Sequence, residues 1–277
     1  MYLCDSLDNY SVVIYSVNMR KIRFIFFFFL LIVQVSLFAA DPFRFALFTD
    51  LHISVLKPQN AEDLKFAIDE VNANPQLSFV LIAGDDTDLG DTTSLKIAKQ
   101  LLDKLKVPYY ITTGNHDTGQ GKIGSVNFVH VFGTDKFSFT FNGYQFIGFP
   151  SGPVKLNAKG HITIEDLEFV KAKLNILKTN ESAFIITHYP LLEGDLDNRL
   201  DLINLMQKYD IKAVLNGHYH RNAIFNYDGI MGIVNRSTQR AKQLQGGYSI
   251  YYVSDSLYVS EKNIGQPERE WLVMPLK

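Results

Sequence analysis

Five short segments of the sequence combine histidine with acidic or amide side chains, the residue types that hold metal ions in proteins. The segments are Asp50-Leu51-His52, Gly84-Asp85-Asp86-Thr87-Asp88, Gly114-Asn115-His116-Asp117, Thr187-His188-Tyr189-Pro190 and Gly217-His218-Tyr219-His220. Each follows an apolar stretch typical of a buried β-strand, so we expect all five to meet at the carboxyl ends of strands. The pattern predicts a metal site.

The spacing within these segments favours a site for two ions. Asp50 and His52 are two residues apart, as are His218 and His220, and an extended or turning backbone places both members of such a pair on one side. The two carboxylate oxygens of Asp85 suit it to bridging two ions. Further donors are the amide oxygen of Asn115 and the imidazole of His188. Nitrogen and oxygen donors without sulfur favour Mn, Fe, Zn or Co over calcium or a structural zinc.

The elements that must position these residues alternate between strand and helix. Short apolar runs lead into each segment, and amphipathic stretches at 61–72, 95–105, 163–178 and 197–209 are spaced as helices, with caps expected at Asp91 and Thr163. This order predicts an α/β fold with parallel strands joined by right-handed crossovers. Asn142-Gly143 predicts a hairpin within 136–149, and residues 223–263 predict antiparallel strands with a turn at Asp228-Gly229. We expect one domain, residues 41–277.

Residues 1–40 have the layout of a secretory signal peptide. Arg20, Lys21 and Arg23 precede an uncharged run of 15 residues, 24–38, which is followed by Ala39-Ala40. We therefore expect export to the periplasm or secretion, with a retained membrane anchor as the alternative because Phe38 does not suit a cleavage site. Met19 is a second candidate for the true start of the chain.

The overall composition narrows the class of partner. The formal net charge is -2, and neither a basic stripe nor a basic patch interleaved with aromatic residues is visible, so we expect no nucleic acid. No protein partner is evident, and contact with a membrane is expected only if the leader stays uncleaved. The single cysteine, Cys4, lies in the leader, which leaves the remainder without a thiolate ligand or a disulfide framework.

In their order, the five segments resemble the calcineurin-like metallophosphoesterase superfamily, whose pattern is D-x-H, G-D-x-x-D, G-N-H-D/E, H and G-H-x-H. The resemblance implies a four-layer αββα sandwich with mixed sheets and ligands at strand carboxyl ends. It implies that Asp50, His52, Asp85 and His220 hold one metal ion and that Asp85, Asn115, His188 and His218 hold the other. It also implies that His116 is the general acid and that Asp117 orients it.

The resemblance implies a dinuclear metal-dependent hydrolase of small phosphoric esters. Two divalent ions outweigh the two carboxylates of such a site, so it attracts phosphate. We favour phosphodiesters over phosphomonoesters, because the G-D-x-x-D form resembles the cyclic-nucleotide and glycerophosphodiester members of the family. The alternatives are a non-catalytic metal-binding interaction module of the same fold and, if the leader is retained, a surface-anchored binding protein.

Every one of these side chains also has a purely structural interpretation. Asp50, Asp85 and Asn115 could form turns or caps, and His188 could be a buried, hydrogen-bonded histidine. Asp88 is expected to hydrogen-bond the ligand loops or to cap a turn, and because purple acid phosphatases carry tyrosine at this position, it argues against that subfamily. Outside the motifs, Arg221 and Arg240 could contact phosphate or lie solvated, and no function is expected of His130 and His161.

Overall fold

A computed structural model of the chain describes residues 41–118, 125–153, 159–178, 181–240 and 246–276. They belong to one compact unit, Asp41–Lys277. The expected leader, residues 1–40, lies outside the described residues. Among the helices that the structure does describe, none combines the length and the apolar character needed to cross a membrane.

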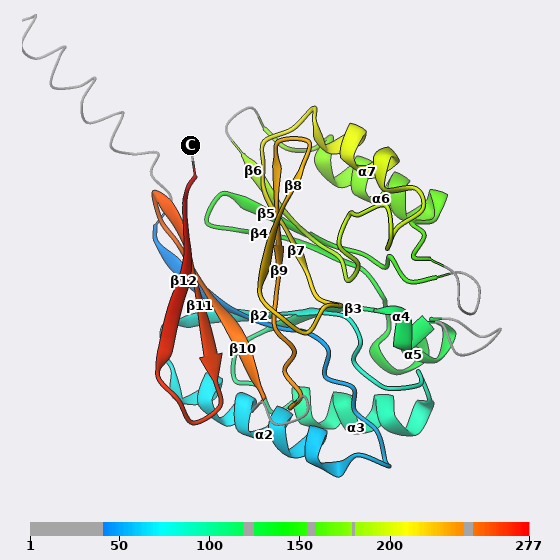
Figure 1. Cartoon of the computed structure of the whole chain (residues 1–277), viewed down its shortest axis with the longest axis vertical. Coiled ribbons are helices and arrows are strands. Elements are labelled where there is room, and N and C mark those ends of the chain that lie inside the picture. The colour runs from blue at the N-terminus through cyan, green and yellow to red at the C-terminus, as the bar shows by residue number, and fades with distance from the viewer. Residues whose placement is uncertain (1–40, 119–124, 154–158, 179–180, 241–245, 277) are drawn as a thin grey trace, which may run out of the picture. The chain divides into compact units, whose positions relative to one another are not determined.

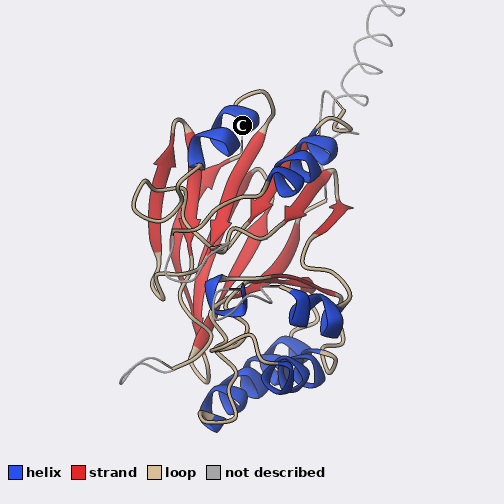
Figure 2. Cartoon of the chain, turned by 90° about the vertical axis from the view of Figure 1, so that its right-hand side faces the viewer, coloured by secondary structure: helices blue, strands red, loops and turns tan. Residues whose placement is uncertain are grey.

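Two six-stranded mixed sheets pack face to face (Figures 1 and 2). The first sheet has the order β12 (Glu268–Pro275), β11 (Ser256–Asn263), β10 (Gly247–Val253), β1 (Phe43–Phe48), β2 (Leu77–Ala83), β3 (Tyr109–Thr112). The second has the order β4 (Phe137–Phe141), β5 (Tyr144–Gly148), β6 (Ser182–Ile186), β7 (Ile211–Asn216), β9 (Ile230–Val234), β8 (Ala223–Tyr227). The strands β1, β2 and β3 are mutually parallel, as are β5, β6, β7 and β9.

Helices cover the outer face of each sheet and complete the expected four layers (Figures 1 and 2). The first sheet carries α2 (Pro58–Ala73) and α3 (Thr92–Leu102), with the short α4 (Asn115–Thr118) and α5 (Val126–Phe132) following β3. The second sheet carries α6 (Ile164–Leu174) and α7 (Arg199–Met206). The predicted αββα sandwich with mixed sheets is confirmed.

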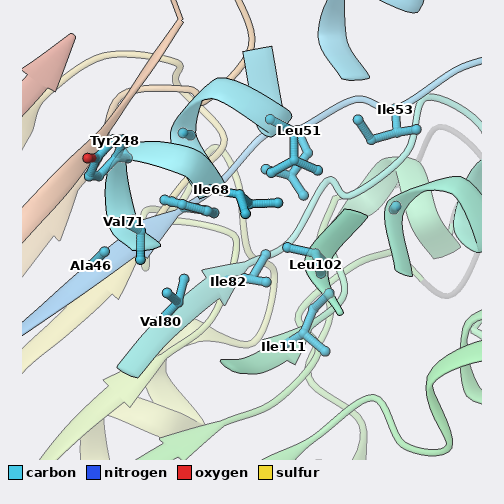
Figure 3. Packing of buried hydrophobic residues seen from close by; sticks show 14 of the residues in the cluster. Ala46, Leu51, Ile53, Ile68, Val71, Val80, Ile82, Leu102, Ile111 and Tyr248 are labelled. Atoms are coloured by element: carbon cyan, nitrogen blue, oxygen red, sulfur yellow. The ribbon is translucent and has the colours of Figure 1, made fainter. Parts of the chain in front are cut away.

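Alternating side chains of the central strands fill two different cores. In β1, Phe45 and Leu47 face the second sheet, whereas Ala46 and Phe48 face α2 and α3, as the two-residue period of a strand requires. Figure 3 shows the cluster to which Ala46 belongs, with Ile68 and Val71 of α2 and Leu102 of α3. Between the sheets the core is rich in aromatic rings, and Phe45 stacks on Tyr251 with ring centroids 4.8 Å apart. A third cluster lies between the second sheet and α6 and α7. The strand ends that carry the ligand segments are thus anchored in packed cores.

Several predicted helix caps and turns are confirmed. Asp91 accepts hydrogen bonds from the backbone N–H groups of Thr93 and Ser94, and Thr163 accepts one from Asp166. Asn142 and Gly143 both have positive φ, 44° and 80°, as a tight hairpin turn requires. The antiparallel tail is confirmed, but it divides between the sheets: β8 and β9 join the second, and β10 pairs with β1 in the first.

The last strand, β12, was not predicted. It begins with Glu268-Arg269-Glu270, which are exposed, and it forms the edge of the first sheet. An edge strand that buries little apolar surface lacks the alternation by which strands are found in a sequence.

Candidate metal centre

The ligand segments lie at the carboxyl ends of adjacent parallel strands. Asp50 and His52 follow β1, Asp85 follows β2, and Asn115 begins α4 just after β3. On the facing sheet His188 follows β6, and His218 and His220 follow the neighbouring β7. Residues from five separate segments therefore meet at one end of the sandwich.

One group of ligand atoms gathers around Asp50. His220 Nε2 lies 3.1 Å from Asp50 Oδ1 and 3.3 Å from His52 Nε2. His52 Nε2 is in turn 3.7 Å from Asp85 Oδ2. The atoms of Asp50, His52 and His220 all lie within 4.8 Å of one another, close enough to hold one ion.

A second group gathers around Asp85 on its other side. Asp85 Oδ2 lies 3.2 Å from His188 Nε2, and Asp85, His188 and His218 offer ligand atoms within 4.8 Å of one another. His116 also lies close, because its ring centroid is 4.7 Å from that of His52 and it groups with His52 and Asp85. Asp85 belongs to both halves of the site, which is the position that a bridging carboxylate needs.

Three buried ligand atoms lack a hydrogen-bond partner among the described residues. They are Asp50 Oδ1, Asn115 Oδ1 and His188 Nε2. Buried polar atoms of folded proteins are nearly always satisfied, so three orphaned acceptors at one place call for a cation. Carboxylate, amide and imidazole donors are the set that suits transition-metal ions, and the residues therefore fit a metal pair.

The backbone at the ligand positions is unusual. Asp50, His52, Asp85, His218 and His220 all have positive φ, between 46° and 72°. This left-handed conformation is uncommon outside glycine and clusters at functional sites. The turning backbone, rather than an extended one, is what brings the two side chains of each pair to the same side.

Contacts at Nδ1 fix which nitrogen of His52, His116 and His188 faces the site. The Nδ1 atoms of His52, His116 and His188 lie 3.2, 2.8 and 2.8 Å from Asp88 Oδ1, the Asp88 carbonyl oxygen and the Ala83 carbonyl oxygen. An acceptor at Nδ1 holds the ring proton there and leaves the Nε2 lone pair for a metal or for substrate.

Asp88 binds the ligand loops, in line with one of its two expected roles. One carboxylate oxygen faces His52, and the other lies 2.8 Å from Lys57 Nζ. Burial opposes ionisation, but the hydrogen bonds from His52 and Lys57 outweigh it and hold the pKa of Asp88 below its usual value. Through its side chain and its carbonyl, Asp88 positions both His52 and His116.

Asp117 does not orient His116, and this expectation is corrected. Its carboxylate accepts hydrogen bonds from the backbone N–H groups of Asp86, Thr87 and Gly114 and from the Thr87 hydroxyl, at 2.9 to 3.0 Å. Neighbouring residues of a helical turn point in different directions, so Asp117 faces the buried ligand loops when His116 faces the site. Through these contacts Asp117 links the ligand segment that follows β2 to the one that follows β3.

The pKa values of Asp85 and His188 follow from the same geometry. Burial alone would raise the pKa of Asp85, but the positive charges of His188 and His52 lower it further than burial raises it. Burial would lower the pKa of His188, yet the negative charge of Asp85, whose Oδ2 lies 3.2 Å from His188 Nε2, raises it to about 9. Without metal, a proton on His188 thus takes over part of the positive charge that a cation would supply.

The residues outside the motifs have separate places. Arg240 makes a bidentate ion pair with the buried Asp63, at 2.6 Å between Nη2 and Oδ1. Arg221 lies over the ring of Tyr219, 5.7 Å from its centroid. His161 pairs with the exposed Asp197. Neither arginine contacts the ligand atoms through these interactions.

The chain belongs to the calcineurin-like phosphoesterase family, whose model matches residues 43–222. It is 28% identical over 239 residues to a probable cyclic nucleotide phosphodiesterase of Ruthia magnifica subsp. Calyptogena magnifica, which covers 81% of this chain and 93% of the relative. It is 26% identical to the serine/threonine-protein phosphatase CPPED1 of Danio rerio over 62% of this chain and 63% of that phosphatase. Family and site together define a metal-dependent phosphoesterase.

Solved structures support the fold. A dimetal phosphatase from Danio rerio superposes with a TM-score of 0.67 and 13% identity, covering 86% of this chain and all of that one. At this identity the likeness concerns the arrangement of strands and helices alone.

Proposed function

We propose that this phosphoesterase hydrolyses phosphodiesters in preference to phosphomonoesters, using two transition-metal ions of the Mn, Fe, Zn or Co type. The likeness to a probable cyclic nucleotide phosphodiesterase over 93% of that relative supports the diester preference, since the likeness to CPPED1 covers only 63% of the phosphatase.

The observation that carries the preference is that Lys57 and Arg240, two cationic side chains beside the ligand segments, are held in ion pairs. Lys57 is paired with Asp88 at 2.8 Å, and Arg240 is paired with Asp63 at 2.6 Å. A phosphomonoester carries close to two negative charges at neutral pH, whereas a diester carries one. A site that offers its metal ions, with Lys57 and Arg240 committed to ion pairs, suits the singly charged ester.

The ligand residues and His116 divide the work of hydrolysis. When bound, the two ions would neutralise phosphoryl charge and lower the pKa of attacking water. Asp50, His52, Asp85 and His220 would hold one ion, and Asp85, Asn115, His188 and His218 the other. His116 donates its Nδ1 proton to the Asp88 carbonyl at 2.8 Å, so in the doubly protonated ring Nε2 is the atom that would give a proton to the departing oxygen.

The non-catalytic module is the less favoured alternative. A binding module has no need of a proton donor, yet His116 is retained, oriented by Asp88 and placed beside His52 and Asp85.

The test is a comparison of substrates after metal exchange. Metal-free protein is reloaded separately with Mn, Fe, Zn and Co and assayed on bis(p-nitrophenyl) phosphate, p-nitrophenyl phosphate and a cyclic nucleotide. We expect a diester kcat/KM above that for the monoester with the best metal, and no turnover in chelator. A monoester preference with every metal would refute the proposal.

We also propose export, on the strength of the leader pattern in residues 1–40. Fractionation of cells that produce the full chain, with a variant starting at Asp41 as control, tests it. Export predicts a shortened product outside the cytoplasm, and recovery of the full chain in the cytoplasm would contradict it.

A further inference from the structure

A carboxylate that belongs to none of the ligand segments stands at the edge of the metal centre. Asp195 Oδ1 lies 3.9 Å from His218 Nε2, and Oδ2 accepts a 2.5 Å hydrogen bond from the Tyr219 hydroxyl. The Asp195 carbonyl oxygen also accepts a 2.8 Å bond from the Gly160 N–H. Its side chain is 15% exposed. The carboxylate is therefore fixed in place, with one oxygen directed toward the site.

Among the described residues, the side chains that face Asp195 carry no fixed positive charge. Its electrostatic neighbours are an imidazole and three phenols, from His218, Tyr189, Tyr219 and Tyr227.

The nearby cations are engaged with other groups. Arg221 lies over the Tyr219 ring, and Lys159 donates to the carbonyl of Glu193. In the part of the chain that the structure describes, Asp195 has no lysine or arginine within ion-pair distance.

We infer that Asp195 is a specificity-determining residue that disfavours doubly charged phosphomonoesters relative to singly charged phosphodiesters. The inference rests on the proposed function and explains how the diester preference is enforced. A partly screened repulsion between the carboxylate and one further negative charge corresponds to a discrimination of about fivefold. A monoester loses its second charge near pH 6, so the discrimination weakens in acid.

The test replaces Asp195 with asparagine, which keeps the shape and the Tyr219 contact but removes the charge. The kcat/KM values for p-nitrophenyl phosphate and bis(p-nitrophenyl) phosphate are compared at about pH 8 and about pH 5, with Mn at a saturating concentration at each pH. We expect the monoester-to-diester ratio to rise about fivefold at the higher pH and to change little at the lower. Binding of inorganic phosphate, measured by calorimetry, should tighten by a similar factor at the higher pH.

Asp197→Asn is the matched control. This substitution makes the same chemical change in the same loop, but the Asp197 carboxylate pairs with His161. It should leave both ratios unaltered. Mn affinity is measured in every variant: an Asp195→Asn protein that loses Mn and slows equally on both esters would show that Asp195 only positions His218, and would overturn the inference. An unchanged ratio and unchanged phosphate binding would also overturn it. If the wild type hydrolyses no diester, the proposed function fails, and phosphate binding still tests Asp195.

Discussion

Replacing Asp85 with asparagine removes the carboxylate that both halves of the metal centre share. Its Oδ2 lies 3.2 Å from His188 Nε2 and 3.7 Å from His52 Nε2. A complete protein site binds a structural zinc ion with an apparent free energy of about 10–16 kcal/mol, so one ligand of four accounts for about 3 kcal/mol. We expect Asp85→Asn to weaken binding of each ion by about a hundredfold or more, with activity lost in parallel.

His116→Gln is the matching variant that should separate metal binding from catalysis. The backbone N–H of His116 donates to Asp85 Oδ1 at 2.9 Å, and this bond survives the substitution because it does not involve the side chain. Loss of a general acid costs about 10²–10⁴ in rate. We expect kcat to fall by that factor while the affinity for metal stays unchanged.

Both variants are titrated with Mn by calorimetry and then assayed on a diester, with circular dichroism as the control for folding. The reasoning requires two distinct outcomes, metal loss in Asp85→Asn and slow turnover with full metal content in His116→Gln. Equal metal loss in both would place His116 among the ligands and refute the separation of roles.

Three further predictions concern the surroundings of the ligands. Because the pKa of His188 is raised to about 9, metal binding should release its proton, and affinity should fall about tenfold for each pH unit below 9, measured by calorimetry in buffers of different ionisation enthalpy. The proton stabilises the metal-free fold below about pH 6.5, and this stability should be lost as the pH rises through about 9, seen as a falling Tm. Asp88→Asn should weaken the binding of one ion by about 10–100-fold, because Asp88 holds the ligand His52 in place. A titration that shows two equal sites would contradict this prediction. Gly217→Ala should cost about 1–3 kcal/mol in denaturant unfolding, because a Cβ there would lie 1.9 Å from Thr49 Oγ1.

The layers of the fold could be predicted because their signals are local. Alternation in β1, the cap at Asp91 and the Asn142-Gly143 turn each depend on a few adjacent residues. The order of strands could not be predicted in the same way. The pairing of β10 with β1, which puts Tyr251 opposite Phe45, joins segments some two hundred residues apart, and only packing of the complete core selects it.

The residue types that form the ligand clusters could likewise be predicted, whereas the residues that support them could not. The ligand segments carry their residues in recognisable order, and the structure brings them together. Asp195 has no motif around it and reaches the site only because Tyr219 and Gly160 fix its loop. The role expected of Asp117 belongs to the Asp88 carbonyl, and a backbone atom leaves no trace in the residue types.

The left-handed backbone at the ligands explains why that support must be extensive. Such conformations cost about 1–3 kcal/mol each outside glycine, and five ligand positions adopt them. The ligand loops hold one another in place: the N–H groups of Asp50 and His52 donate to the carbonyls of Gly84 and Asp85 at 2.9 Å, and the His218 N–H donates to Asp50 Oδ2 at 3.1 Å. Because each loop restrains the next, the backbone strain is distributed over ligand loops from both sheets and is not confined to a single turn. These backbone bonds hold the ligand side chains in place, and substitutions that loosen them should weaken metal binding even when every ligand side chain is intact.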